Sequence, residues 1–208
     1  MIALPDGPTR LVDLAANPLL ALARPWSAPL AAQLLAELMA RIPWTDGHYT
    51  VAGRRFALPR LQCWFADPGV AYRYADQLEN SRPWTADLAA LRTWVETATG
   101  ATFNAVLANL YRDGADRVAW HADDDDDLGP MPVIASLSLG ATRRFHWRPR
   151  PGVAGAPGSL ALSPGTLLLM KAPFQRDWQH AVLPEPTIGA PRLNLTFRQV
   201  VDRPAGLA

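Results

Sequence analysis

The chain has 208 residues, a formal net charge of +1 and an apolar content of 49%. This size and composition predict one folded domain with a full core and exclude wholesale disorder. Such a small net charge leaves a nucleic-acid partner dependent on a local basic patch. The single cysteine, Cys63, excludes an internal disulfide. Without a signal-peptide pattern or a membrane-length apolar run, we expect a soluble cytoplasmic protein that does not bind membranes.

The first half of the chain predicts two helices. Residues 1–27 contain several prolines and are expected to drape over the domain. An amphipathic pattern over 27–42 (SAPLAAQLLAELMARI) predicts a helix with Ser27 as its N-cap. A second helix is expected over 85–100, capped near Thr85 and ended by Gly100.

From residue 103 onward the pattern changes to strands. Short apolar or alternating runs, separated by proline or glycine, occur at 103–111, 133–140, 143–147, 165–170, 178–182 and 192–201. Several short strands following two helices predict an α+β protein with a β-sandwich or jelly roll and helices on one sheet. The proline- and glycine-rich segment 148–159 is expected to be an exposed loop.

An unusual acidic run occurs at 119–130 (AWHADDDDDLGP), where five consecutive aspartates start two residues after His121. On an extended strand the side chains of His121 and Asp123 project the same way and are able to share one ion. The best third ligand is His180, which lies in a predicted strand. Two histidines and one carboxylate are the ligand set of non-haem Fe(II) oxygenases.

The acidic run could also have a role that needs no iron. An EF-hand-like calcium loop is disfavoured, because Leu128 stands where that loop needs glycine and Ile134 where it needs glutamate. The residues alone also leave open that His121 is a surface residue beside a hydrated acidic loop.

The last predicted strand (PRLNLTFRQVV) places four polar residues on one face, namely Arg192, Asn194, Thr196 and Arg198. Two arginines inside a barrel would be costly unless anions met them. A dicarboxylate is a natural partner, because each guanidinium is able to hold a carboxylate with two hydrogen bonds. From this pattern alone, the polar face could equally be the solvated side of the strand.

Together, the segments NAVLANLYRDGADRVAWHADDDDDLGP, VIASLSLGATRRF, LLLM…WQHAVLPE and PRLNLTFRQV resemble the AlkB-like family in order and spacing. Members of that family are Fe(II)- and 2-oxoglutarate-dependent dioxygenases that demethylate nucleic-acid bases. The resemblance covers roughly residues 50–200. It implies a double-stranded β-helix (jelly roll) with an N-terminal nucleotide-recognition lid. Within the single domain 1–208, we expect an extension and helix at 1–50, the lid at 51–85 and the catalytic core at 103–200.

The resemblance also implies the residues of the site. Iron would be held by His121, Asp123 and His180. The co-substrate 2-oxoglutarate would be bound by Asn109, Tyr111, Arg192, Asn194 and Arg198, with Arg192 on its distal carboxylate and Arg198 near the end that chelates iron. The expected cofactors are therefore Fe(II), 2-oxoglutarate and O2.

On the substrate side, the resemblance implies Tyr72, Tyr74, Asp125 and Arg60. Tyr74 would stack on a flipped base opposite the ring of His121, and Asp125 would meet the amino edge of that base. Candidate phosphate contacts are Arg54, Arg55, Arg60, Arg143, Arg144, Arg148 and Arg150. The tyrosines could instead pack in the core, and the arginines could instead be ordinary exposed surface residues.

One position departs from the family. Duplex-acting relatives place an aromatic wedge just before the glycine that matches Gly53, whereas this chain has Ala52 there. Either another residue serves as the wedge, for example Phe56, or the protein prefers single strands.

The expected function is direct-reversal DNA repair, the oxidative demethylation of bases such as 1-methyladenine and 3-methylcytosine. We expect a monomer that acts on alkylated DNA, single-stranded as well as or rather than duplex. The alternatives are an RNA demethylase, or a protein or small-molecule hydroxylase that uses the same iron site. A non-catalytic nucleic-acid-binding module is disfavoured, because binding alone needs no iron ligands.

Overall fold

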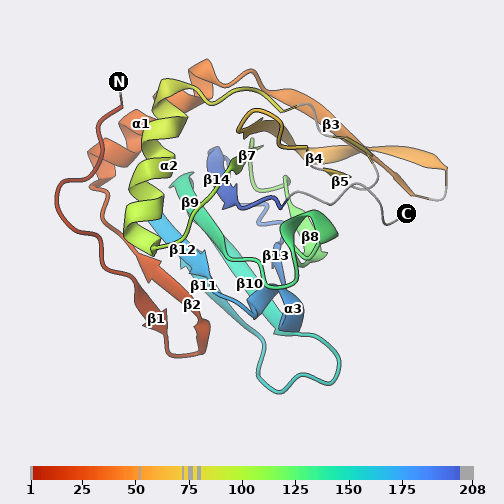
Figure 1. The fold of residues 1–208 in the computed structure, drawn as a ribbon. Coiled ribbons are helices and arrows are strands. Elements are labelled where there is room, and N and C mark those ends of the chain that lie inside the picture. The colour runs from red at the N-terminus through yellow and green to blue at the C-terminus, as the bar shows by residue number, and fades with distance from the viewer. Residues whose placement is uncertain (1, 52, 72, 75–76, 79–80, 202–208) are drawn as a thin grey trace.

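The structure is a computed structural model that describes residues 2–201 except 52, 72, 75–76 and 79–80. In this part of the chain the strands form two main antiparallel sheets and one short hairpin (Figure 1). In spatial order, the larger sheet contains β1 (Val12–Leu14), β2 (Asn17–Ala23), β12 (Thr166–Met170), β9 (Ile134–Gly140), β14 (Arg192–Arg198), β7 (Ala105–Tyr111), β4 (Arg54–Ala66) and β3 (Thr45–Val51). The smaller sheet contains β11 (Gly158–Leu162), β10 (Arg143–Pro149), β13 (Trp178–Val182) and β8 (Val118–His121). The remaining elements are the hairpin β5 (Arg73–Tyr74) and β6 (Gln77–Leu78), the helical turn α3 (Phe174–Asp177) and the 3-10 turn η1 (Asp126–Leu128).

Two helices cover one face of the larger sheet, as the sequence predicted (Figure 1). Helix α1 (Ala28–Arg41) begins after Ser27, whose hydroxyl accepts a hydrogen bond from the first turn. Helix α2 (Ala86–Thr99) is capped in the same way by Thr85 and ends at Gly100. Gly100 has a φ of 70°, a left-handed conformation that glycine adopts without steric cost. Both helices bury an apolar stripe against the sheet.

Strand β14 has one face toward the helices and the other toward the space between the two sheets. Its apolar residues belong to the core on the helix side. Leu193, Leu195 and Phe197 point to the helix side, where they pack with Leu34, Leu38, Leu88, Leu91, Ala108 and Leu137. Between the two sheets, the core is formed by residues such as Trp64, Ile134, Phe145, Trp147, Leu168, Met170 and Phe174. The alternate residues of β14 face this inner space, which is where the site lies.

The N-terminal segment differs from its expectation. Residues 12–23 form β1 and β2 rather than an irregular cover, and β2 pairs with β12, so that Leu20 lies opposite Met170. This pairing joins residues far apart in sequence, which local patterns do not reveal. Strand β4 was also missed. With β3 it forms a hairpin that projects beyond the body of the sheet (Figure 1).

None of the helices described in the structure is long and apolar enough to cross a membrane.

Candidate active site

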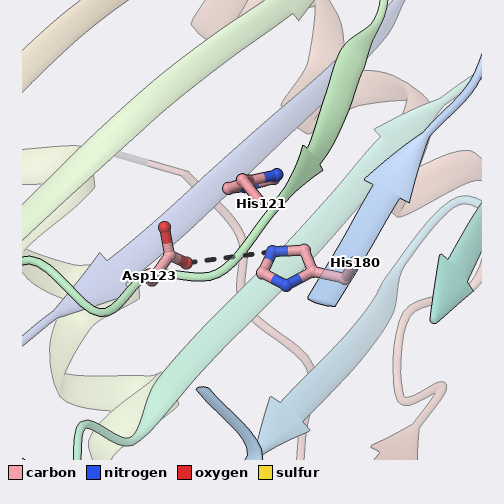
Figure 2. A group of neighbouring side chains, drawn as sticks. All are labelled: His121, Asp123 and His180. Carbon is pink, nitrogen blue, oxygen red and sulfur yellow. Dashed lines mark ion pairs between the residues drawn. The ribbon is translucent and has the colours of Figure 1, made fainter. Parts of the chain in front are cut away.

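The three predicted metal ligands come together where β8 and β13 pair. His121 is the last residue of β8 and lies opposite His180 of β13. Asp123 follows β8 by two residues, and its Oδ2 lies 4.0 Å from Nε2 of His180. One ligand atom from each residue lies within 4.8 Å of the others, so a single ion is able to bind all three (Figure 2). The expected His-Asp-His cluster is therefore present in the fold.

Neighbouring groups orient His121 and Asp123. Nδ1 of His121 lies 2.8 Å from the carbonyl oxygen of Ala119. Because a carbonyl only accepts, that nitrogen carries the proton and Nε2 keeps its lone pair for a metal. The backbone N–H of Asp123 donates to Oε1 of Gln175 at 3.0 Å, and Nη2 of Arg198 donates to Oδ1 of Asp123 at 2.6 Å. The carboxylate is held in place before any metal binds.

Electrostatics keep Asp123 and His180 in the protonation states that bind a metal. Burial alone would raise the pKa of Asp123, but the guanidinium of Arg198 and the two histidines outweigh it, so the pKa lies below its ordinary value. Burial lowers the pKa of His180 to about 3, and neighbouring His121 adds to this effect. A charged carboxylate and a neutral imidazole are the forms that bind Fe(II).

A polar wall adjoins the metal ligands in the same cavity. The cavity is lined by every residue predicted for iron and 2-oxoglutarate, that is by Asn109, Tyr111, His121, Asp123, His180, Arg192, Asn194 and Arg198. These side chains come from β7, β8, β13 and β14 and from the segment after β8. Arg192 lies directly opposite Tyr111 on the paired strands, and its guanidinium carbon is 5.0 Å from the centre of that ring.

The hydrogen bonding of Arg192 fits an anion. Arg192 is 2% exposed, and its Nη2 donates to Ser138 at 2.8 Å and to Asn194 at 2.6 Å. Among the residues that the structure describes, its Nε and Nη1 have no hydrogen-bond partner. Burial lowers the pKa of Arg192, yet an arginine keeps its charge at neutral pH. A buried cation with two unmet donors is the group that a carboxylate would satisfy.

The predicted substrate residues are less completely described. Tyr72 and Ala52 lie outside the described residues, and so does the side chain of Tyr74. Asp125 is half-buried, two residues after Asp123. Arg60 is 6% exposed and lines the cavity, where its Nε donates to Oδ1 of Asn109 at 2.9 Å. Arg60 thus lies inside the pocket rather than on the outer surface, and its substrate role stays a prediction.

The other residues of the acidic run have different environments. Asp124 is exposed and forms an ion pair with Arg150. Asp127 is buried rather than solvated, and its carbonyl oxygen accepts from the N–H of Val201 at 2.8 Å. Phosphate contact by Arg143 is a wrong prediction, because this side chain is 1% exposed and its donors are bonded inside the protein.

Sequence reasoning missed three polar residues at the site. Ser136 and Ser138 of β9 line up beside β14, and their hydroxyls lie 2.8 and 3.3 Å from Oδ1 of Asn194. Their alternation within VIASLSLG was a usable signal, because residues two apart on a strand share a face. The third, Gln175, is fully buried in α3, and no sequence pattern marks it.

Comparisons with known proteins agree with the cofactors expected for this chain. The model of the 2OG-Fe(II) oxygenase superfamily matches residues 18–198. Alpha-ketoglutarate-dependent dioxygenase alkB homolog 3 of Homo sapiens is 38% identical over 181 residues, which are 83% of this chain and 63% of that protein. DNA oxidative demethylase ALKBH2 of Homo sapiens is 34% identical over 180 residues, 82% of this chain and 69% of that protein.

A solved structure supports the fold. The structure of OsALKBH1 matches with a TM-score of 0.57 and 17% identity, covering 91% of this chain and 99% of that one. The chain belongs to the AlkB-like family of 2OG-Fe(II) oxygenases, and the predicted jelly roll with helices on one sheet is confirmed. It spans 63% of the length of human alkB homolog 3.

Proposed function

We propose that this chain is an Fe(II)- and 2-oxoglutarate-dependent dioxygenase that removes methyl groups from alkylated DNA bases such as 1-methyladenine and 3-methylcytosine. The observation that carries this proposal is one cavity that joins the His121–Asp123–His180 cluster to the buried cation Arg192. The names of the two human relatives support the dioxygenase class, and that of ALKBH2 supports DNA as substrate.

In this proposal the residues bind either the metal or the co-substrate, according to their position in the cavity. His121, Asp123 and His180 hold Fe(II). Arg192 binds the distal carboxylate of 2-oxoglutarate, while Arg198 fixes Asp123 and adds positive charge near the metal. When bound, Fe(II), 2-oxoglutarate and O2 supply the oxidising chemistry. The chain contributes ligand geometry, anion binding and a cavity lined on its smaller-sheet side by apolar residues such as Phe145 and Val182.

The substrate would approach from the side of the β3–β4 hairpin, whose second strand, β4, falls in the segment 51–85 proposed as the lid. Phe56 of β4 is 39% exposed, and the guanidinium of Arg54 lies 5.8 Å from its ring centre. An exposed ring beside a cation is suited to stacking on a base near a phosphate backbone. We propose that Phe56 is the wedge, because the chain has alanine at position 52, where duplex-acting relatives have an aromatic residue. Tyr74 and Asp125 complete the proposed contacts to the flipped base.

Mass spectrometry of an oligonucleotide tests the function. A short single-stranded DNA with one 1-methyladenine is incubated with protein, Fe(II), ascorbate and 2-oxoglutarate, beside a matching duplex and a matching RNA. Loss of one methyl group's mass that requires every component supports the proposal, and the three substrates rank strand and sugar preference. Succinate formation without demethylation of any of them would point to a protein or small-molecule substrate instead.

A further inference from the structure

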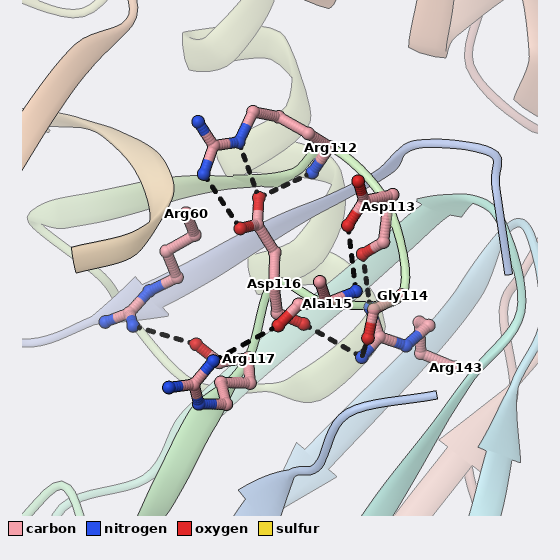
Figure 3. Close-up of polar contacts among 8 residues, drawn as sticks. All are labelled: Arg60, Arg112, Asp113, Gly114, Ala115, Asp116, Arg117 and Arg143. Atoms are coloured by element: carbon pink, nitrogen blue, oxygen red, sulfur yellow. Dashed lines mark hydrogen bonds and ion pairs between the residues drawn. The ribbon is translucent and has the colours of Figure 1, made fainter. Parts of the chain in front are cut away.

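Arg143, the first residue of β10, is a buried arginine with an unusual set of partners (Figure 3). Its Nη1 donates to the carbonyl oxygen of Asp113 at 3.0 Å, and its Nε lies 3.1 Å from the carboxylate of Glu185. Its Nη2 donates to the carbonyl oxygens of Asp116 at 2.9 Å and Leu183 at 2.8 Å. A planar guanidinium is able to satisfy several carbonyls in fixed directions, which no other side chain does.

These partners connect the two strands that carry the histidines. Asp116 lies two residues before β8, which ends at His121. Leu183 is the residue after β13, which contains His180. One nitrogen of Arg143 therefore holds the start of one ligand strand to the end of the other.

The same guanidinium also lies near Tyr111, which lines the cavity and is predicted to bind 2-oxoglutarate. The ring of Tyr111 has the guanidinium carbon of Arg143 5.7 Å from its centre and that of Arg192 5.0 Å from its centre. Tyr111 and Arg192 line the cavity, whereas Arg143 does not. Arg143 thus supports a pocket residue without reaching the pocket.

The connection between β7 and β8 is also packed tightly against the segment that follows β13. The N–H of Gly114 donates to Ile188 at 2.7 Å, and its carbonyl oxygen accepts from the N–H of Glu185 at 2.8 Å. A Cβ on Gly114 would lie 1.8 Å from the carbonyl oxygen of Glu185. Arg112 donates three hydrogen bonds to the carboxylate of Asp116, from its backbone N–H and its Nε at 2.8 Å each and from its Nη2 at 2.9 Å (Figure 3). The connection is therefore held against residues 185–188, next to Leu183 and Glu185, which Arg143 also bonds.

We propose that Arg143 is a positioning residue for 2-oxoglutarate binding. By fixing Tyr111 and the connection from β7 to β8, it sets where the carboxylate-binding end of the cavity lies relative to the iron-binding histidines. The inference rests on the cofactor site of the proposed function and is independent of the nucleic-acid substrate. Its test therefore needs no DNA.

The test is the variant Arg143→Lys. Lysine keeps the charge but offers one compact ammonium that cannot reach all these acceptors at once. Calorimetry of oxygen-free, Mn(II)-loaded protein should show 2-oxoglutarate affinity about 10-fold weaker, as for other residues that orient a site from behind. The affinity for Mn(II) should change by less than about 3-fold, because His121 keeps its contact with Ala119 and Asp123 keeps its bonds to Gln175 and Arg198. A purely structural role would weaken both affinities by the same factor.

Arg92→Lys is the matched control. Arg92 of α2 also lies over an aromatic ring, with its guanidinium carbon 5.0 Å from the centre of Trp84, and it pairs with Asp67 at 2.6 Å. It lies away from the cavity, on the helix side, so its 2-oxoglutarate affinity should stay within about 2-fold of wild type.

If Arg143→Lys does not fold, the variant Glu185→Gln is measured in its place. It removes the charged partner of Arg143 but leaves the bonds to the carbonyls, so 2-oxoglutarate affinity should fall by about 3-fold. Wild-type 2-oxoglutarate affinity in a folded Arg143→Lys, equal losses for metal and co-substrate, or, in the fallback, no change in Glu185→Gln would each overturn the inference. Failure of the wild type to bind 2-oxoglutarate would instead contradict the cofactor site itself.

Discussion

Both faces of β14 are buried, but they have opposite chemistry. Leu193 and Leu195, on the helix side, are 0% exposed, and Arg192 and Arg198, on the cavity side, are 2% and 5% exposed. Burying a leucine contributes about 1.5–3 kcal/mol to folding, whereas burying a charge costs several kcal/mol unless it is paired. The apolar face therefore stabilises the sheet, whereas burying the arginines of the polar face has a free-energy cost that a bound anion would offset. Variants on each face should separate stability from binding.

The largest effect is expected from Asp123→Ala on the metal side of the cavity. Residues that merely orient metal ligands already cost 10–100-fold when changed, so loss of a ligand should reduce turnover by at least about 100-fold. The measurement is succinate release with a methylated oligonucleotide present. Turnover near the wild-type rate would show that the cluster does not hold the catalytic metal.

Leu195→Ala tests the helix-side face. Leu195 is fully buried between the sheet and the helices, so the substitution should lower the free energy of unfolding by about 2–5 kcal/mol. Urea denaturation measures this loss. The folded variant should bind 2-oxoglutarate as the wild type does; a selective loss of binding would mean that the two faces are not separate.

The low pKa of His180 predicts a pH-dependent stability of the metal-free protein. The unfolded histidine takes up a proton near pH 6.5, but the folded one does so only at about 3. As pH falls through this window the unfolded state gains protons first, so stability decreases, with a slope that approaches about 1.4 kcal/mol per pH unit. His180→Gln lacks this component. In urea titrations with a chelator, the free energy of unfolding of the wild type minus that of the variant should decrease as the pH is lowered. If the two free energies change with pH in parallel, the burial of a neutral His180 is contradicted.

The smallest effect is expected from Asp124→Ala, the neighbour of Asp123. Its exposed ion pair with Arg150 should contribute no more than about 1 kcal/mol, and turnover should stay near wild type. A loss as large as that of Asp123→Ala would show that the acidic run acts as a unit.

The sequence predicted the features that rest on local pattern. The alternation of β14 and the His-x-Asp spacing follow from the period of a strand, but from these patterns alone both could have been solvated surface. The resemblance to the AlkB-like family was what implied that they form one site. Arg143 was misread, because RRF looks like exposed basic sequence and its acceptors are carbonyls from distant segments. The pairing of β2 with β12 and the contact of Gln175 with Asp123 are likewise products of long-range packing, which a local pattern does not encode.

Calorimetric titration of 2-oxoglutarate into oxygen-free, Mn(II)-loaded protein tests the central claim most directly, with wild type compared with Arg192→Met. Methionine fills space without charge, so the variant should fold at least as stably, since removing a buried, under-satisfied cation is often neutral or stabilising. We expect wild type to bind 2-oxoglutarate and the variant to bind at least about 10-fold more weakly, because the charge-assisted hydrogen bonding of Arg192 to a carboxylate is lost. Equal affinity in both proteins would contradict the assignment of the polar face of β14 to the co-substrate.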